Sequence, residues 1–155
     1  MEKTVHKPPN LRTENWRNKQ LNTFRTHFTV ATDKIADLMG GGIPQNKIRE
    51  WYEPGISGAY SVHGSTSIEN ALEIFKIDWQ PLDQSLKRYN ISLFPQLQGH
   101  GYGLKINQII EELSRALGVK RLVLASITND RWHKRLLKEG FHQDINDPHS
   151  VFKDL

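Results

Sequence analysis

Hydrophobic side chains in the first half of the chain recur with two different periods. The side chains of residues 24–30 alternate between a polar face and a more apolar face that carries Phe24 and Phe28. This alternation predicts a half-buried strand. Residues 32–39 then show helical spacing, and a run of glycines ends that helix. A second short helix is predicted over residues 44–52, and residues 58–64 are expected to form another strand.

The next segment, residues 65–80, fits two structures. Its first part has helical spacing and a capping-box pattern, whereas residues 75–79 alternate between apolar and charged side chains. We favour a strand for the second half and leave the first half open. A further strand is predicted over residues 90–94.

The C-terminal half has clearer patterns. Residues 102–117 are predicted to form an amphipathic helix that Gly118 ends. Residues 121–127 are apolar on both faces, which is typical of a central strand. A last helix is expected between Asn129 and Gly140, and a last strand over residues 150–155.

These elements predict a fold of the α/β (α+β) class, in the order β-α-α-β-β-β-α-β-α-β. Helices would pack on a mixed, largely antiparallel sheet. Residues 1–22 are predicted to be a basic arm, and residues 23–155 a single domain that is long enough to bury one core.

Composition narrows the classes of function. The chain has no cysteine, which excludes disulfides, thiolate metal sites and a cysteine nucleophile. The seven histidines show no His-x-x-x-His spacing, so no metal site is expected. No apolar run approaches the ~20 residues of a membrane span, and residues 1–10 have no signal-peptide pattern. We therefore expect a cytoplasmic protein without membrane contact.

Positive charge is concentrated at the N-terminus. Residues 1–30 hold six Lys or Arg against two Glu, a surplus of four that equals the net charge of +4. Such a segment is either a solvated tail or a contact for nucleic acid or another acidic partner.

A glycine-rich stretch, Gln98 to Gly103, connects the strand predicted at residues 90–94 to the helix at 102–117. Pro95 ends the strand because it has no N–H to donate. A glycine-rich turn at a helix N-terminus presents free backbone N–H groups and the positive end of the helix dipole. The stretch therefore predicts an anion site, most naturally for phosphate.

This stretch resembles the central motif of the GNAT superfamily of acyl-CoA-dependent N-acyltransferases. Pro95, Gln98, Gly101 and Gly103 stand in the family's register. A second family feature, an Asn followed eleven residues later by Gly-Phe, is matched by Asn129 and the pair at 140–141. The resemblance implies a sheet with helices on both faces.

The resemblance also implies a site for acetyl-CoA, the acyl donor. Backbone groups of Leu93 and Pro95 would contact the pantetheine, Asn129 would hold it from the next strand, and the amide of Leu93 would stabilise the oxyanion. The pyrophosphate would lie on a cradle formed by Gln98, Gly99, His100, Gly101, Tyr102 and Gly103.

The expected proton-transfer groups depart from the family pattern. The family's general-acid Tyr corresponds to Leu136, which cannot donate a proton. His133, one turn earlier, is a candidate substitute, with an exposed helix histidine as the alternative. The candidate general base is Asp78, with Glu73 and His63 as alternatives.

Three functions are therefore compatible with the sequence. The first is transfer of an acetyl or similar acyl group to a primary amine of an unidentified acceptor, a small molecule or a protein. The second is a GNAT-like binding or structural protein that has lost catalysis. The third is association with nucleic acid through residues 1–30. A homodimer is compatible with each of them.

Overall fold

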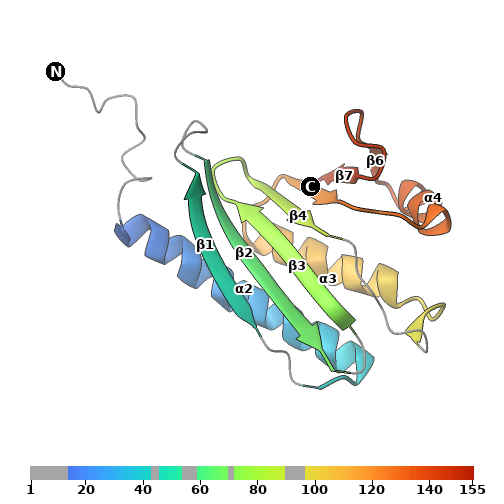
Figure 1. The fold of residues 1–155 in the computed structure, drawn as a ribbon, viewed down its shortest axis with the longest axis horizontal. Helices are drawn as coiled ribbons and strands as arrows, with labels where there is room; N and C mark the ends of the chain where they lie inside the picture. Colours follow the sequence, from blue (N-terminus) through green and yellow to red (C-terminus); the bar gives the residue numbers. More distant parts are fainter. Residues whose placement is uncertain (1–13, 43–45, 54–58, 70–71, 90–96) are drawn as a thin grey trace.

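The computed structural model describes residues 14–42, 46–53, 59–69, 72–89 and 97–155. Figure 1 shows the arrangement of these elements. The helices are α2 (Glu14–Met39), α3 (Tyr102–Ala116) and α4 (Asp130–Lys138). The strands are β1 (Lys47–Glu53), β2 (Ala59–Ile68), β3 (Leu72–Gln80), β4 (Ser85–Arg88), β5 (Arg121–Leu124), β6 (His142–Gln143) and β7 (Val151–Asp154).

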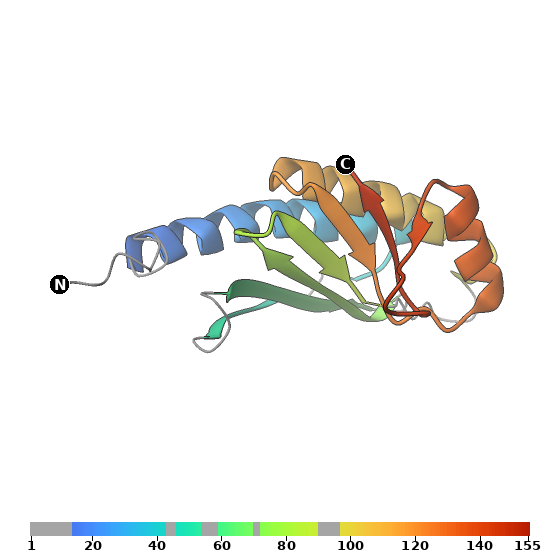
Figure 2. The same ribbon diagram turned by 90° about the horizontal axis from the view of Figure 1, so that it is seen from above.

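The strands form one seven-stranded sheet in the order β1-β2-β3-β4-β5-β7-β6. Neighbouring strands are antiparallel except β4 and β5, which are parallel. The mixed α/β class and the largely antiparallel sheet are thus confirmed. Helices were predicted on both faces. The two long helices, α2 and α3, share one face, and the opposite face of β1–β4 carries no helix among the described residues (Figure 2).

The predicted strand at residues 24–30 was wrong, because this segment belongs to helix α2. Its buried side chains include Phe24, Phe28, Ala31 and Ile35, whose spacings of four, three and four residues follow a helix. Val30, which a strand would have buried, is 48% exposed. Residues 14–22 of the predicted arm also lie in this helix, whereas residues 1–13 lie outside the described residues.

The predicted helix over residues 44–52 was also wrong, since residues 47–53 form the edge strand β1. Ile48 and Tyr52 are half-buried on the same side of that strand. The strand favoured for the second half of 65–80 is confirmed as β3, and β2 extends to Ile68. The strand predicted at residues 90–94 lies outside the described residues, and β4 and β6 were not predicted.

Aromatic rings join α2 to the sheet. The ring centroids of Phe24 and Phe28 lie 5.2 Å apart. Phe24 stacks on Trp79 of β3 and Phe28 stacks on Phe75 of β3, each with 6.0 Å between the centroids. Gly64 of β2 lies beneath them, where an added Cβ would come within 2.8 Å of the Phe24 ring. This contact fixes the helix against β2 and β3.

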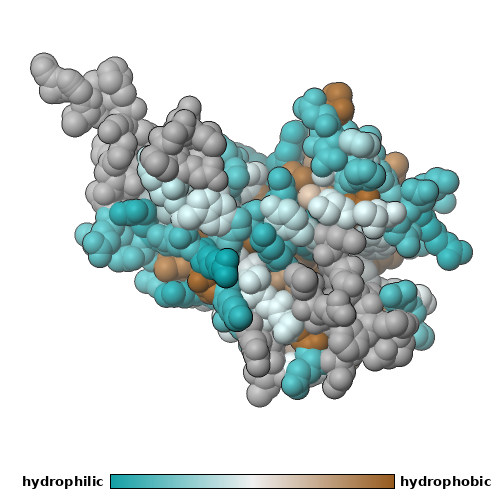
Figure 3. All heavy atoms as spheres, viewed as in Figure 1, coloured by the Kyte–Doolittle hydropathy of each residue, from teal (hydrophilic) through white to brown (hydrophobic). Residues whose placement is uncertain are grey.

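The opposite face of β1–β4 is more polar. Figure 3 shows it mostly in hydrophilic and intermediate colours. It carries the exposed cations Arg49 and Lys87, with Lys76 half-buried between them and close to the ring of Tyr89. Among the described helices, not one combines the length and the apolar character needed to span a bilayer.

Arg88 is a charged residue in the core of the helix-covered face. It pairs in register with the buried Ile77 and is only 1% exposed. Desolvation lowers the pKa of Arg88 to about 9. Its Nη1 donates to the carbonyl of Tyr89 (3.1 Å). Within the described part of the chain, its Nε has no partner and no carboxylate pairs with it.

Replacing this buried charge by an apolar side chain of similar length should stabilise the fold. We expect Arg88→Met to raise the free energy of unfolding by about 1–4 kcal/mol, because the desolvation penalty disappears. Urea unfolding measures the change. Lys87→Met also replaces a cation by Met, but at the neighbouring exposed position, and its free energy of unfolding should stay within about 0.5 kcal/mol of that of the original protein. A lower midpoint for Arg88→Met would show that the guanidinium is well compensated.

Candidate functional site

The turn before α3 adopts a left-handed backbone at two glycines. Gly99 has a φ of 80° and Gly101 a φ of 79°, a region that side chains with a Cβ rarely enter. Apart from the adjoining residues, a Cβ added at either position would meet no atom of the described part of the chain within 4 Å, so the turn is open toward those residues. The backbone here is therefore accessible to a ligand.

Helix α3 begins at this turn without a side-chain cap from its N-cap residue. Its N-cap residue is Gly101, which has no side chain to accept a hydrogen bond, and no acidic residue occupies the first turn. Four N–H groups at a helix N-terminus lack partners within the helix, and the helix dipole adds a partial positive charge there. The start of α3 is thus suited to an anion.

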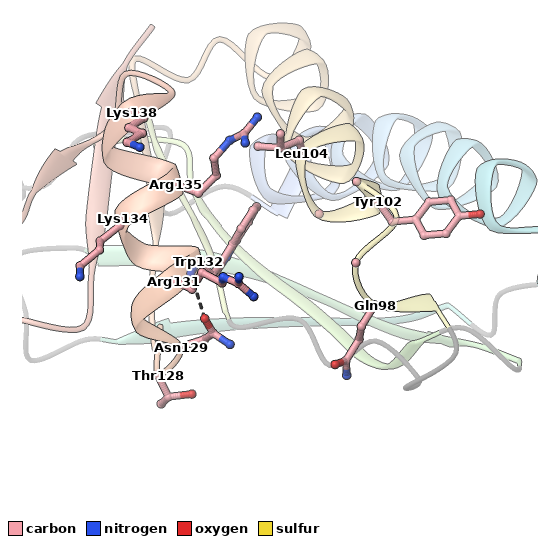
Figure 4. A pocket seen from close by; sticks show the side chains of 13 residues that line it. Gln98, Tyr102, Leu104, Thr128, Asn129, Arg131, Trp132, Lys134, Arg135 and Lys138 are labelled. Atoms are coloured by element: carbon pink, nitrogen blue, oxygen red, sulfur yellow. Dashed lines mark hydrogen bonds between the residues drawn. The ribbon is translucent and has the colours of Figure 1, made fainter.

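A cleft of about 1050 Å³ separates the start of α3 from α4, at the upper end of the size of ligand pockets. Figure 4 shows Arg131 and Arg135 extending from α4 toward the turn and α3, whereas Lys134 points away from α3 and Tyr102 points away from α4. The lining residues are Gln98, Gly99, Gly101, Tyr102, Gly103, Leu104, Thr128, Asn129, Arg131, Trp132, Lys134, Arg135 and Lys138.

Helix α4 forms the other wall of the cleft, and its N-terminus is capped. Asn129 is the N-cap, and its Oδ1 accepts a hydrogen bond from the backbone N–H of Trp132 (2.9 Å). The Trp132 ring packs against Gly103 of α3, where an added Cβ would come within 3.0 Å of the ring. This contact sets the distance between the two walls.

The charge of the cleft is strongly positive. Four cations of α4 line it, Arg131, Lys134, Arg135 and Lys138, and no acidic residue is among the described residues of the lining. We call these four residues the α4 cationic stripe. In the described part of the chain only Arg135 of the stripe has an ion pair, an exposed one with Glu139 (3.2 Å).

Most residues of the predicted cradle meet in this cleft. Gln98, Gly99, Gly101, Tyr102 and Gly103 lie on one side of it, and the predicted pantetheine contact Asn129 lies on the other. His100 is exposed in the turn and is not among the lining residues. Leu93 and Pro95 lie outside the described residues.

The predicted base Asp78 lies away from this cleft, on the helix-free face of the sheet. One carboxylate oxygen pairs with Nδ1 of His63 on β2, and the other accepts a hydrogen bond from the Tyr89 hydroxyl (2.6 Å). Burial and this hydrogen bond raise the pKa of Tyr89 to about 12. The structure thus joins two base candidates, Asp78 and His63, in one network.

The predicted acid His133 faces away from the cleft lining. Its Nε2 lies 2.6 Å from Oε1 of Gln143 on β6, and the Gln143 amide nitrogen is occupied by backbone carbonyls. This arrangement requires the His133 Nε2 to donate. Leu136, at the family's Tyr position, is fully buried in the core.

The α4 cationic stripe is the feature that sequence reasoning missed. Its members stand at positions i, i+3, i+4 and i+7, which share one helix face. That spacing was readable from the sequence. Which way the face points depends on how Trp132 packs against Gly103, and the sequence pattern does not contain this contact.

Comparisons with known proteins identify similar folds only. No family model and no curated protein matches the chain. Among solved structures it is similar to Tetrahymena GCN5, at 11% identity over 59% of this chain and 68% of that one, with a TM-score of 0.48. It is also similar to a PaiA N-acetyltransferase from Thermoplasma acidophilum in complex with coenzyme A (12% identity, 61% of both chains, TM-score 0.48).

A third similar structure is an IAA acetyltransferase from Bacillus cereus, at 13% identity over 72% of this chain and all of that one, with a TM-score of 0.45. The match with PaiA spans less than two thirds of that protein. At such identities and scores, what this chain binds has to be judged from its own cleft.

Two glycines provide a matched test of the turn as a binding element. Gly101 and Gly118 both have left-handed φ values (79° and 73°) and open space where a Cβ would be added, but only Gly101 lines the cleft. Gly101→Ala and Gly118→Ala should each destabilise the fold by about 1–2 kcal/mol. Only Gly101→Ala should also weaken coenzyme A binding in calorimetry, by about tenfold or more, because its methyl group occupies ligand space. Equal affinities of the two variants would show that the turn does not contact the ligand.

Proposed function

We propose that this chain is an N-acyltransferase, which moves an acetyl or similar acyl group from acyl-CoA to a primary amine. One observation supports this most strongly. The uncapped start of α3, with its two left-handed glycines, faces the α4 cationic stripe across a single cleft. The similar solved structures include acetyltransferases, and one of them was solved with coenzyme A.

The residues present fit the phosphate end of acyl-CoA. The first-turn N–H groups of α3 suit a diphosphate, and Gly99 and Gly101 leave the backbone open to it. Acyl-CoA, when bound, supplies an acyl group activated as a thioester. Gln98 and Asn129 add polar side chains on the two sides of the cleft. The Asn129 Oδ1 is used by the α4 cap, so its amide N–H₂ is the group that can donate to a ligand.

As proposals, we assign the general base to the pair of Asp78 and His63 and the general acid to His133. An attacking amine must lose a proton, and a histidine oriented by a carboxylate is a common acceptor. Asp78 would therefore act through His63, as a positioning residue. His133 would protonate the leaving thiolate only after releasing its hydrogen bond to Gln143.

A second function is favoured by one observation. Leu136 is fully buried, so no side chain at the family's Tyr position can protonate a leaving group. The alternative is therefore a protein that binds acyl-CoA without catalysing transfer. Contact with nucleic acid through residues 1–30 stays a prediction, as does a homodimer.

Acetyl-CoA should stabilise the folded chain. At 100 times its Kd, a ligand that binds only the folded state adds about 2.7 kcal/mol to the free energy of unfolding. We expect a concentration-dependent rise in Tm in a thermal-shift experiment, and none with acetate alone. No rise at millimolar acetyl-CoA would exclude both the enzyme and the binding protein.

The variant Asp78→Asn distinguishes the acyltransferase from a protein that only binds acyl-CoA. If the network acts in catalysis, thiol release from acetyl-CoA in the presence of mixed primary amines should fall by about 10²- to 10⁴-fold, because a general base contributes that much. The affinity for acetyl-CoA should not change, and Asp83→Asn, in the exposed turn after β3, should keep full activity. Activity that survives in Asp78→Asn would reduce the network to a structural role.

A further inference from the structure

The α4 cationic stripe is longer and more highly charged than a single diphosphate site needs. From Arg131 to Lys138 it extends over eight residues, or about 10 Å along the helix axis. The proposed diphosphate site lies on the other wall, at the first turn of α3. The cleft therefore offers a second anion position that the glycine turn does not account for.

The stripe is poorly explained as a merely solvated helix face. Its members are like-charged neighbours at i, i+3 and i+4, and such pairs destabilise a helix. Arg131 stands in the first turn, where the helix dipole disfavours a cation, whereas Arg135 and Lys138 stand near the favourable C-terminal end. An anion in the cleft would relieve the repulsion and would account for Arg131 as well.

Coenzyme A carries two separate phosphate groups at one end, the diphosphate and the 3′-phosphate of its ribose. The monoester phosphate has the higher charge, about −1.5 to −2 at neutral pH. We propose that the α4 cationic stripe binds this 3′-phosphate, so that the cleft distinguishes CoA from its 3′-dephospho form. The inference rests on the proposed function, since it assigns a specificity to the same site.

Arg131 and Arg135 are the members that determine this preference. Both extend toward the turn and α3 in Figure 4. A guanidinium can bind a phosphate through two N–H groups at once. The ion pair of Arg135 with Glu139 does not prevent this, because both side chains are about half exposed and such a pair is weak.

The chain offers a matched control for Arg135. Arg115, on α3, is also an exposed arginine that pairs with a glutamate four residues away, the half-buried Glu111 at 3.8 Å, and it does not line the cleft. Arg115→Gln and Arg135→Gln therefore remove the same charge and the same kind of pair. Only the second removes a cation from the cleft.

Calorimetry with CoA and 3′-dephospho-CoA tests the inference on the full chain. The original protein should bind CoA about tenfold more tightly than dephospho-CoA. This ratio is what one hydrogen bond between an arginine and the 3′-phosphate supplies when water screens the two charges. Arg135→Gln and Arg131→Gln should each bring that ratio down, toward 1, mainly by weakening CoA. Arg115→Gln should keep the original ratio.

Three outcomes would overturn the inference, and they differ from failure of the proposed function. Equal affinities of the original protein for the two ligands would show that the 3′-phosphate is not recognised. If Arg135→Gln lowers the affinities for CoA and dephospho-CoA equally, the stripe binds the diphosphate. If the ratio of the two affinities is unchanged in both Arg131→Gln and Arg135→Gln, other residues cause the preference for CoA. Absence of any CoA binding would instead remove the proposed function, and the inference with it.

Discussion

The parallel pairing of β4 with β5 is the constraint on which the arrangement of the site depends. It is the one parallel pair in the described sheet, with Leu86 opposite Leu122 and Arg88 opposite Leu124. Parallel neighbours need a crossover connection, and here that connection includes the glycine turn and α3. Both strands are followed by a helix, so the N-termini of α3 and α4 come to the same end of the sheet. The cleft lies between them.

The errors in the predicted fold have one physical origin. Side chains four residues apart share a face in a helix and also in a strand, so such a pair does not identify the element. Phe24 and Phe28 were assigned to a strand and lie in α2, and Ile48, Trp51 and Tyr52 were assigned to a helix and lie in β1. The longer pattern of α3, which extends over 15 residues, predicted the helix correctly. Longer runs resolved the ambiguity that single pairs left.

The candidate site was predictable where local chemistry determines it. The turn from Gln98 to Gly103 follows from its glycines, and Asn129 follows from its place as a helix cap. The direction of the α4 cationic stripe and the contact of Asp78 with His63 and Tyr89 depend instead on tertiary packing and strand register. Residues 90–96, which include Leu93 and Pro95, lie outside the described residues, so their predicted contacts remain predictions.

Binding and catalysis depend on different parts of this molecule. Binding is supported by a cleft in which an uncapped helix end faces four cations, and a polar anion is the ligand that such a cleft favours. Catalysis needs proton transfer, and its candidates are held by other partners, Asp78 by Tyr89 and His63, and His133 by Gln143. Leu136 is buried among apolar side chains, so restoring a hydroxyl there would require repacking the core. An anion site in this cleft therefore does not require the proposed proton-transfer groups, because neither Asp78 nor His133 is among the described residues that line it.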